Sequence, residues 1–471
     1  MIIKRASNAA TPRFVAGLVV MLSFIVLPGC ATTSIFSSYP SQIQPLKQQV
    51  INKQYKVAQD RLEKHRSDND KILYMMERGR ISQIAKDNDA SIEDFKQVIA
   101  AMEENENKAR LSLSDTAGQG AALLTNDNAI PYSGESYERV FVHHFQAMNY
   151  LFADNVNGAL VEVRRANEQQ KLAFTKHEDE IADIAEKQGA NAGNDSKFMA
   201  SFAALDVAAG RVKNSFQNAY TFYASGVLYE VLGSLNDAYI DYKKALEIFP
   251  DNPYLQQDVL RLSKQLGMRE DYQQFKKTFS VPLKEPGDGQ GEIIVFFEHG
   301  FAPVKQQVKV PFFVSSQVHT AAFPIYGKIW ETTSPLNLSY GDGAVLGQTS
   351  PIVYVQALAA KALKERLPSM LVRQVLRVAS KKQMVDNTSG LGQLAIGILN
   401  IITENADQRS WQTLPNDAQI FRAYISAGEH NLLLSNGTAS DTISITVEAG
   451  KKTIVRIVAT GATLHTDATT L

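Results

Sequence analysis

Apolar residues recur at three- and four-residue steps along most of the first half of the chain. This spacing holds from Gln42 to Phe279, and it is typical of amphipathic helices. After Ser280–Glu292, a segment rich in proline and glycine, apolar and polar residues alternate instead. Alternation is typical of strands with one buried face. The pattern therefore predicts a helical region at 42–279, a linker at 280–292 and a β-rich region at 293–471.

The segment 219–250 has the clearest internal pattern, in which small residues stand where two helices would cross and tyrosines lie beside them. A Gly233-Ser234 turn separates the two expected helices, and a proline ends the second, because proline cannot continue a helix. The spacing resembles the tetratricopeptide repeat (TPR), although Phe222 stands at the usual Trp position and Ser225 at the usual Leu position. The packing residues are Gly226, Tyr229, Ala238, Tyr242, Ala245 and Pro250.

A second copy is expected at about 140–170, and a weaker one at 72–103. Residues 253–279 have the polar end of a capping repeat, so four or five units are predicted, and ordinary helical hairpins are the alternative. Two insertions are expected: a loop at 104–137, and an antiparallel arm at 171–217 made of helices from Lys171 to about Gln188 and from Phe198 to about Gln217. The packing residues of the second copy are Ala147, Tyr150, Ala159 and Ala166.

The first 29 residues have the layout of a secretory signal peptide, with a basic start and an apolar run from Phe14 to Leu27. The run ends in Leu27-Pro28-Gly29-Cys30, which resembles the lipobox of bacterial lipoproteins. That resemblance implies that Cys30, the only cysteine in the chain, carries acyl chains such as palmitate and anchors the protein to a membrane. Residues 30–41 then form a tether. Ala31 and Thr32, with no Asp after Cys30, favour the outer membrane, with the protein facing the periplasm.

Several segments together resemble a family of proteobacterial outer-membrane TPR lipoproteins. They are Leu124–Glu138, Ala147–Leu151, Val161–Arg165 and Arg409–Pro415, so the resemblance covers most of the chain. It implies a class of protein and a location, and it brings no catalytic residues with it.

The C-terminal region reads as a small antiparallel β-sandwich with inserted helices. Strands are expected at 293–297, 306–314, 419–425, 431–435, 442–448 and 453–459, and the stretch from Ala427 onward resembles PEGA-type surface sandwiches. Helices are expected at about 351–403, with Leu367-Pro368 breaking the first. The first is basic, so it lies either on anionic lipid or packed on the sandwich, and we favour packing. The expected fold class is therefore α+β: a TPR-like all-α solenoid followed by a β-sandwich-like domain.

The net charge and the sequence motifs limit the classes of function to be expected. Net charge is -1, and removing Lys4, Arg5 and Arg13 with the signal leaves 48 - 3 = 45 basic against 49 acidic residues, so nucleic acid is not expected as a partner. The sequence contains no familiar catalytic, phosphate-binding or metal-binding motif. His143 and His144 point about 100° apart on a helix, His177 lies in a charged stretch, and Glu298-His299-Gly300 reads as a turn. We therefore expect no enzyme, cofactor or metal site.

These features predict a periplasm-facing scaffold that binds an envelope protein on the concave wall formed by the first helices of the repeats. Such a scaffold would support assembly or regulation of an envelope complex. Two alternatives stay open: a regulator of cell-wall enzymes, and an enzyme with an unrecognised site in the C-terminal domain.

Overall fold

The computed structural model describes residues 38–66, 70–112, 128, 130–187, 196–314, 317–327, 333–386, 405–437 and 439–471. The chain divides into two units, Met1–Ser38 and Tyr39–Leu471, and every described residue except Ser38 belongs to the second unit. Cys30 and the signal segment lie outside the described residues. Of the helices within those ranges, none is both long enough and apolar enough to cross a bilayer.

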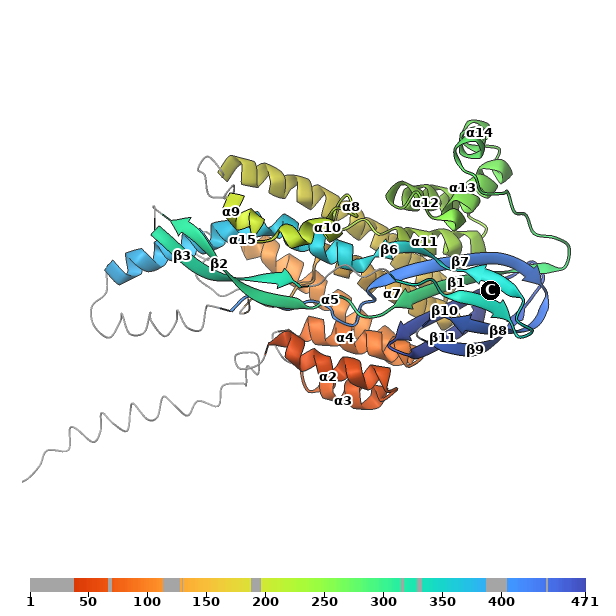
Figure 1. The fold of residues 1–471 in the computed structure, drawn as a ribbon, viewed down its shortest axis with the longest axis horizontal. Helices are drawn as coiled ribbons and strands as arrows, with labels where there is room; N and C mark the ends of the chain where they lie inside the picture. The colour runs from red at the N-terminus through yellow and green to blue at the C-terminus, as the bar shows by residue number, and fades with distance from the viewer. Residues whose placement is uncertain are drawn as a thin grey trace, which may run out of the picture. The chain divides into compact units, whose positions relative to one another are not determined.

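The helical half is a TPR-like stack of hairpins (Figure 1). Within hairpins, α4 packs on α5, α7 on α8, α11 on α12, and α13 on α14, and between hairpins α5 meets α7, α8 meets α11, and α12 meets α13. The helices are α2 (Tyr39–Ile51), α3 (Tyr55–Glu63), α4 (Lys71–Ile84), α5 (Asn88–Ser112), α7 (Ser136–Phe152), α8 (Val156–Lys187), α9 (Ser196–Ala200), η3 (Ala203–Leu205), α10 (Asp206–Ala209), α11 (Ala219–Val231), α12 (Leu235–Ile248), α13 (Pro253–Gln265), α14 (Arg269–Thr278) and α15 (Val355–Asp386).

Local sequence explains where these helices begin and end. The Asn218 side chain accepts hydrogen bonds from the first backbone N–H groups of α11, and Asn252 does the same for α13. Glu135 and Glu138 form a reciprocal capping box at the start of α7. Gly233, with φ +74°, lies in the turn after α11, where a left-handed backbone favours glycine.

Of the two helices predicted for the arm at 171–217, the first is helical to Lys187 but does not begin at Lys171, and the second is wrong. No glycine or proline interrupts the chain near Lys171, so α8 runs on from Val156 as one helix. The second helix expected there is replaced by three short helices, α9, η3 and α10. Phe198 and Phe202 in this segment pack on Phe323 of the β-rich half, with ring centroids 5.0 and 6.1 Å away.

Within its described residues, the β-rich half contains three sheets. A five-stranded sheet has the order β11-β10-β1-β7-β6, a four-stranded sheet has the order β5-β4-β8-β9, and β2 pairs with β3 alone. The prediction of purely antiparallel strands is wrong, because β1 and β10 pair in parallel. The strands are β1 (Gln290–His299), β2 (Lys305–Val314), β3 (Gln317–Tyr326), β4 (Asn337–Tyr340), β5 (Val345–Gln348), β6 (Ser350–Tyr354), β7 (Asp417–Ser426), β8 (Gly428–Ser435), β9 (Ser440–Val447), β10 (Lys452–Thr460) and β11 (Thr463–Thr470).

Strand β1 is buried on both faces, which explains its unbroken apolar run. Ile294 and Phe296 face the core shared with the helices, whereas Ile293 and Val295 face a second core between the two larger sheets. The five-stranded sheet is therefore a middle layer, with helices on one side and the four-stranded sheet on the other.

Helix α15 passes through Pro368 without ending, so the predicted break at Leu367-Pro368 is wrong. Proline removes one backbone hydrogen bond, but Leu358, Leu363 and Leu367 are buried and hold the helix against the protein. The first half of this basic helix is therefore packed on protein rather than free to lie on lipid.

Candidate functional site

The two helices of the 219–250 hairpin cross at Gly226. A Cβ atom added there would lie 2.4 Å from Cε1 of Tyr242, so only glycine fits. Tyr242 donates its hydroxyl proton to Glu230 at 2.7 Å. Around this crossing, Ala238 and Ala245 are fully buried, Tyr229 lies under the guanidinium of Arg164, and Pro250 is exposed two residues after α12.

The second predicted copy lies in α7 and α8. Ala147, Ala159 and Ala166 are buried, whereas Tyr150 is partly exposed at the edge of the core. The structure thus places small side chains between these two helices, as it does in the 219–250 hairpin.

The first helices of the hairpins are buried almost all round. Twelve of the 14 residues of α4, 13 of the 17 of α7 and 12 of the 13 of α11 are buried, whereas α12 buries six of 14 and α14 buries none. A helix whose side chains are buried on every side is surrounded by other parts of the chain. We call the surface formed by α4, α7 and α11 the inner wall. The expectation that a partner binds on the first helices is therefore wrong for these three, because the chain itself covers them.

Part of this cover is the segment Arg409–Pro415, which the sequence had singled out only as a family likeness. Glu77 of α4 accepts hydrogen bonds from the backbone N–H groups of Gln412 at 2.7 Å and Thr413 at 2.9 Å. Glu138 of α7 accepts one from Trp411 at 2.8 Å. Carboxylates from two neighbouring hairpins thus hold the backbone of one extended segment.

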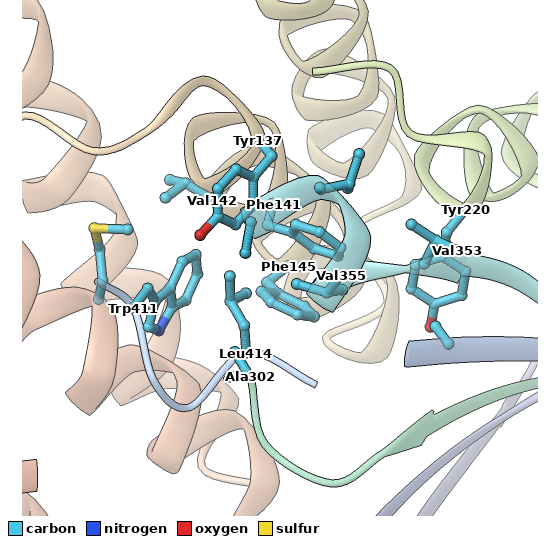
Figure 2. Close-up of a cluster of buried hydrophobic side chains, with 14 of the residues drawn as sticks. Tyr137, Phe141, Val142, Phe145, Tyr220, Ala302, Val353, Val355, Trp411 and Leu414 are labelled. Atoms are coloured by element: carbon cyan, nitrogen blue, oxygen red, sulfur yellow. The ribbon is translucent and has the colours of Figure 1, made fainter. Parts of the chain in front are cut away.

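The Trp411 side chain fixes the same segment by packing. It is fully buried, with its ring centroid 5.9 Å from that of Phe95 and 5.7 Å from that of Phe145. Figure 2 shows Trp411 and Leu414 directed toward Phe145 on α7. Burial raises the pKa of Glu77 to about 7, although its hydrogen bonds with Thr413, Gln412 and Tyr39 oppose the shift.

The rest of the cover is the five-stranded sheet, joined to the inner wall by buried charges. Arg80 of α4 pairs with Glu298 of β1, and the Tyr220 hydroxyl of α11 donates to the same carboxylate at 3.0 Å. Glu298 and His299 belong to β1, so the turn predicted at Glu298-His299-Gly300 begins only at Gly300, where φ is +67°.

A second buried cluster surrounds Arg422 of β7. Arg422 donates to Glu292 of β1 at 2.5 Å, to Glu230 of α11 at 2.7 Å and to Asp258 of α13 at 3.0 Å. Although burial opposes it, attraction to Arg422 and Arg261 holds the pKa of Glu230 far below its usual range. One guanidinium therefore ties two helices to two strands.

The histidines flagged in the helical half do not form a site together. His143 Nδ1 lies 2.7 Å from Glu162, whereas the His144 ring lies against Tyr220 with centroids 4.5 Å apart. The side chain of His177 lies outside the described part of the chain. Across the residues that the structure describes, no three His, Cys, Asp or Glu side chains gather in a way that could hold a metal ion.

Sequence reasoning missed the buried charges that join the two halves. Their signal was present as charged residues within apolar runs: Glu77 and Arg80 in helix α4, and Arg422 in the strand Gln419–Ile425. Lys, Glu, Arg and Asp are rarely buried unless paired. Such positions imply partners, but the partners lie up to 336 residues away, and spacing along one element does not identify them.

No family model matches this sequence, and a search of curated proteins gave no match. Solved structures that resemble about half of the chain include MamA, with 11% identity over 49% of this chain and 89% of that chain and a TM-score of 0.28. PilW, a widely conserved type IV pilus biogenesis factor, has 16% identity over 53% of this chain and 93% of that chain, with a TM-score of 0.22. The TPR2AB domain of yeast Sti1 in a complex with pHSP90 has 10% identity over 50% of this chain and 87% of that chain, with a TM-score of 0.20. The stacked hairpins of the helical half are defined by the contacts between successive helices of this chain itself.

Proposed function

We propose that this chain is an outer-membrane lipoprotein, anchored through Cys30 and facing the periplasm, that acts as a protein-binding scaffold in an envelope complex. Because its own C-terminal half covers the inner wall, the partner binds the outer surface formed by the second helices of the hairpins. The observation that carries this proposal is the burial of α4, α7 and α11 beside the exposure of α8 and α12.

Helices α8 and α12 are in direct contact. Asn167 of α8 donates to Asp241 of α12 at 3.0 Å, and the same two helices expose apolar side chains. Val161 is 47% exposed and Ile240 is 50% exposed. We take these two exposed apolar side chains as contact points for the proposed partner, because the buried centre of an interface is apolar.

The enzyme alternative gains no support from the buried acid Glu230. The shifted pKa of Glu230 has a structural cause, because both carboxylate oxygens are engaged by arginines. A carboxylate held charged in this way is a poor proton donor near neutral pH.

A photo-crosslinking experiment tests the proposed surface. A photoreactive residue replaces Val161 or Ile240 in the full chain in its own cells, and Val345, 81% exposed on β5, serves as the control position. We expect one and the same protein to crosslink from both helices and not from Val345, and Val161→Asp to reduce the adduct formed from position 240. Adducts that form only from Val345 would contradict the proposal.

The lipid anchor is tested separately. Cys30→Ser removes the only thiol that could be acylated, so the protein should leave the membrane fraction and take up no labelled fatty acid. Ala31→Ser is the control and should stay in the membrane fraction. Labelled fatty acid on the Cys30→Ser protein would refute anchoring at this residue.

A further inference from the structure

A cavity of about 480 Å³ opens where the last helices meet the five-stranded sheet. It lies beside the Arg422 cluster and is lined by residues from α11, α12, α13, β1, β7 and β10. Its volume is within the range of small-molecule sites. The charged residues that line it are Glu230, Arg261, Lys264, Glu285, Glu292, Lys451 and Lys452.

The buried acids of this cavity are already satisfied. Glu230 accepts from Arg261 at 2.6 Å through one oxygen and from Arg422 at 2.7 Å through the other. Glu292 accepts from Arg422 through both oxygens and from Lys452 at 2.5 Å. Neither carboxylate is left to attract a cation from solvent.

The basic groups, in contrast, keep donors to spare. Arg261 uses only Nη2 in its pairs with Glu230 and Asp258, although a guanidinium carries five N–H donors. Lys452 gives one of its three ammonium protons to Glu292, and its side chain is 21% exposed. The wall of the cavity therefore presents unused N–H donors and occupied carboxylates.

Two further lysines stand at the mouth. Lys264 pairs with Glu285 and Lys451 with Glu448, and these acids are 56% and 51% exposed. Ion pairs in water are worth little, so a bound anion can replace either acid. Tyr424 lines the same cavity, and burial raises its pKa to about 12, so its hydroxyl keeps its proton and can donate.

We propose that this cavity binds a small polyanion through its carboxylate or phosphate oxygens, with Arg261 and Lys452 as the inner donors and Lys264 and Lys451 at the entrance. Charge-assisted hydrogen bonds from such donors are stronger than those between neutral groups. The four donors belong neither to α8 nor to α12, which contributes only Leu235 to the cavity, so either proposal can fail without the other.

Calorimetric titration of the full chain with citrate and with pyrophosphate tests the proposal. We expect saturable binding of at least one of the two probes. Lys452→Gln should weaken it about tenfold, which corresponds to about 1.4 kcal/mol, and Lys264→Gln should weaken it less. The two probes distinguish a site for carboxylates from a site for phosphates.

Lys244→Gln is the matched control, because Lys244 also pairs with a buried acid, Asp241, but does not line the cavity. It should bind the probe as the parent chain does. If thermal unfolding shows that Lys452→Gln does not fold, the test rests on Lys264→Gln alone. Absence of binding by both probes, equal loss in the Lys244→Gln control, or unchanged binding in Lys264→Gln and any folded Lys452→Gln would overturn the proposal.

Discussion

Single residues decide how closely the two helices of the 219–250 hairpin approach. At Gly226 the neighbouring ring of Tyr242 occupies the space that any side chain would need. That ring cannot move freely, because its hydroxyl is hydrogen-bonded to Glu230 and to Arg422. The close approach of two helices is thereby coupled to the charges that bind the sheet.

Even the smallest substitution at this crossing should be costly. Gly226→Ala should lower the free energy of unfolding by about 1–3 kcal/mol, because the added methyl group must displace Tyr242, and thermal or urea unfolding measures it. Gly158→Ala in α8 is the control, since the three atoms nearest to its Cβ belong to the side chain of Asn155 on the protein surface. An unchanged stability of Gly226→Ala would mean that the helices do not cross closely at this position.

His144 makes stability depend on pH. It is fully buried, and burial together with Arg80 and Arg456 lowers its pKa from 6.5 to about 3. Between these values the unfolded chain binds a proton that the folded chain does not, so this residue makes stability fall as the pH falls from about 6.5 toward 3. His144→Phe should remove this contribution, because Phe141, Phe145 and Tyr220 surround the ring.

Unfolding curves at pH 7.5 and pH 5 measure the effect. The loss of stability between the two should be smaller for His144→Phe than for the parent chain. The partly exposed His430 of β8 provides the control variant His430→Gln, which should leave the loss as it is. A parent-like loss in His144→Phe would show that His144 does not titrate in this way.

At the scale of elements, the segment Arg409–Pro415 packs between the helices and the rest of the chain. Trp411→Ala should lower the free energy of unfolding by about 3–5 kcal/mol, because it leaves a cavity between Phe95 and Phe145. Denaturant unfolding measures this. Phe313→Ala is a suitable control, because Phe313 is 53% exposed on β2. Equal losses in the two variants would contradict the role assigned to Trp411.

Elements with local signals could be predicted from the sequence. The helix pair around Gly226 and the strand at Gln419–Ile425 have the periodicity and turn residues that define them. The parallel pairing of β1 with β10 could not be predicted, because the partners Glu292 and Lys452 are 160 residues apart. The inner wall was misjudged for the same reason: helix periodicity shows which face is apolar, not which part of the chain covers it.

At the scale of the whole molecule, the helical and β-rich halves of the second unit share one core. That core extends from Tyr39 through Tyr220 to Ile454 and Val458. The two halves are therefore parts of one folding unit, although their sequence patterns suggest separate domains.

A fragment of residues 39–279 should fail to fold alone, because it would expose the apolar side chains of α4, α7 and α11 to water. It should aggregate or lack a cooperative thermal transition, and co-expression with residues 280–471 should restore a soluble complex. Size-exclusion chromatography and circular dichroism measure both results. A fragment that is monomeric and melts cooperatively would show that the helical repeats are independent of the sheet.

The central place of β10 has a consequence for the order in which the chain is completed. Residues 452–460 lie between β11 and β1 inside the five-stranded sheet, yet ribosomes release them after β1 and after all the helices of the shared core. The apolar faces of the helices therefore stay exposed until this strand has been synthesised. A growing chain in that state aggregates unless a chaperone binds it. A premature stop codon shortly before residue 452 should therefore yield a chain that proteases degrade, rather than a shorter functional protein.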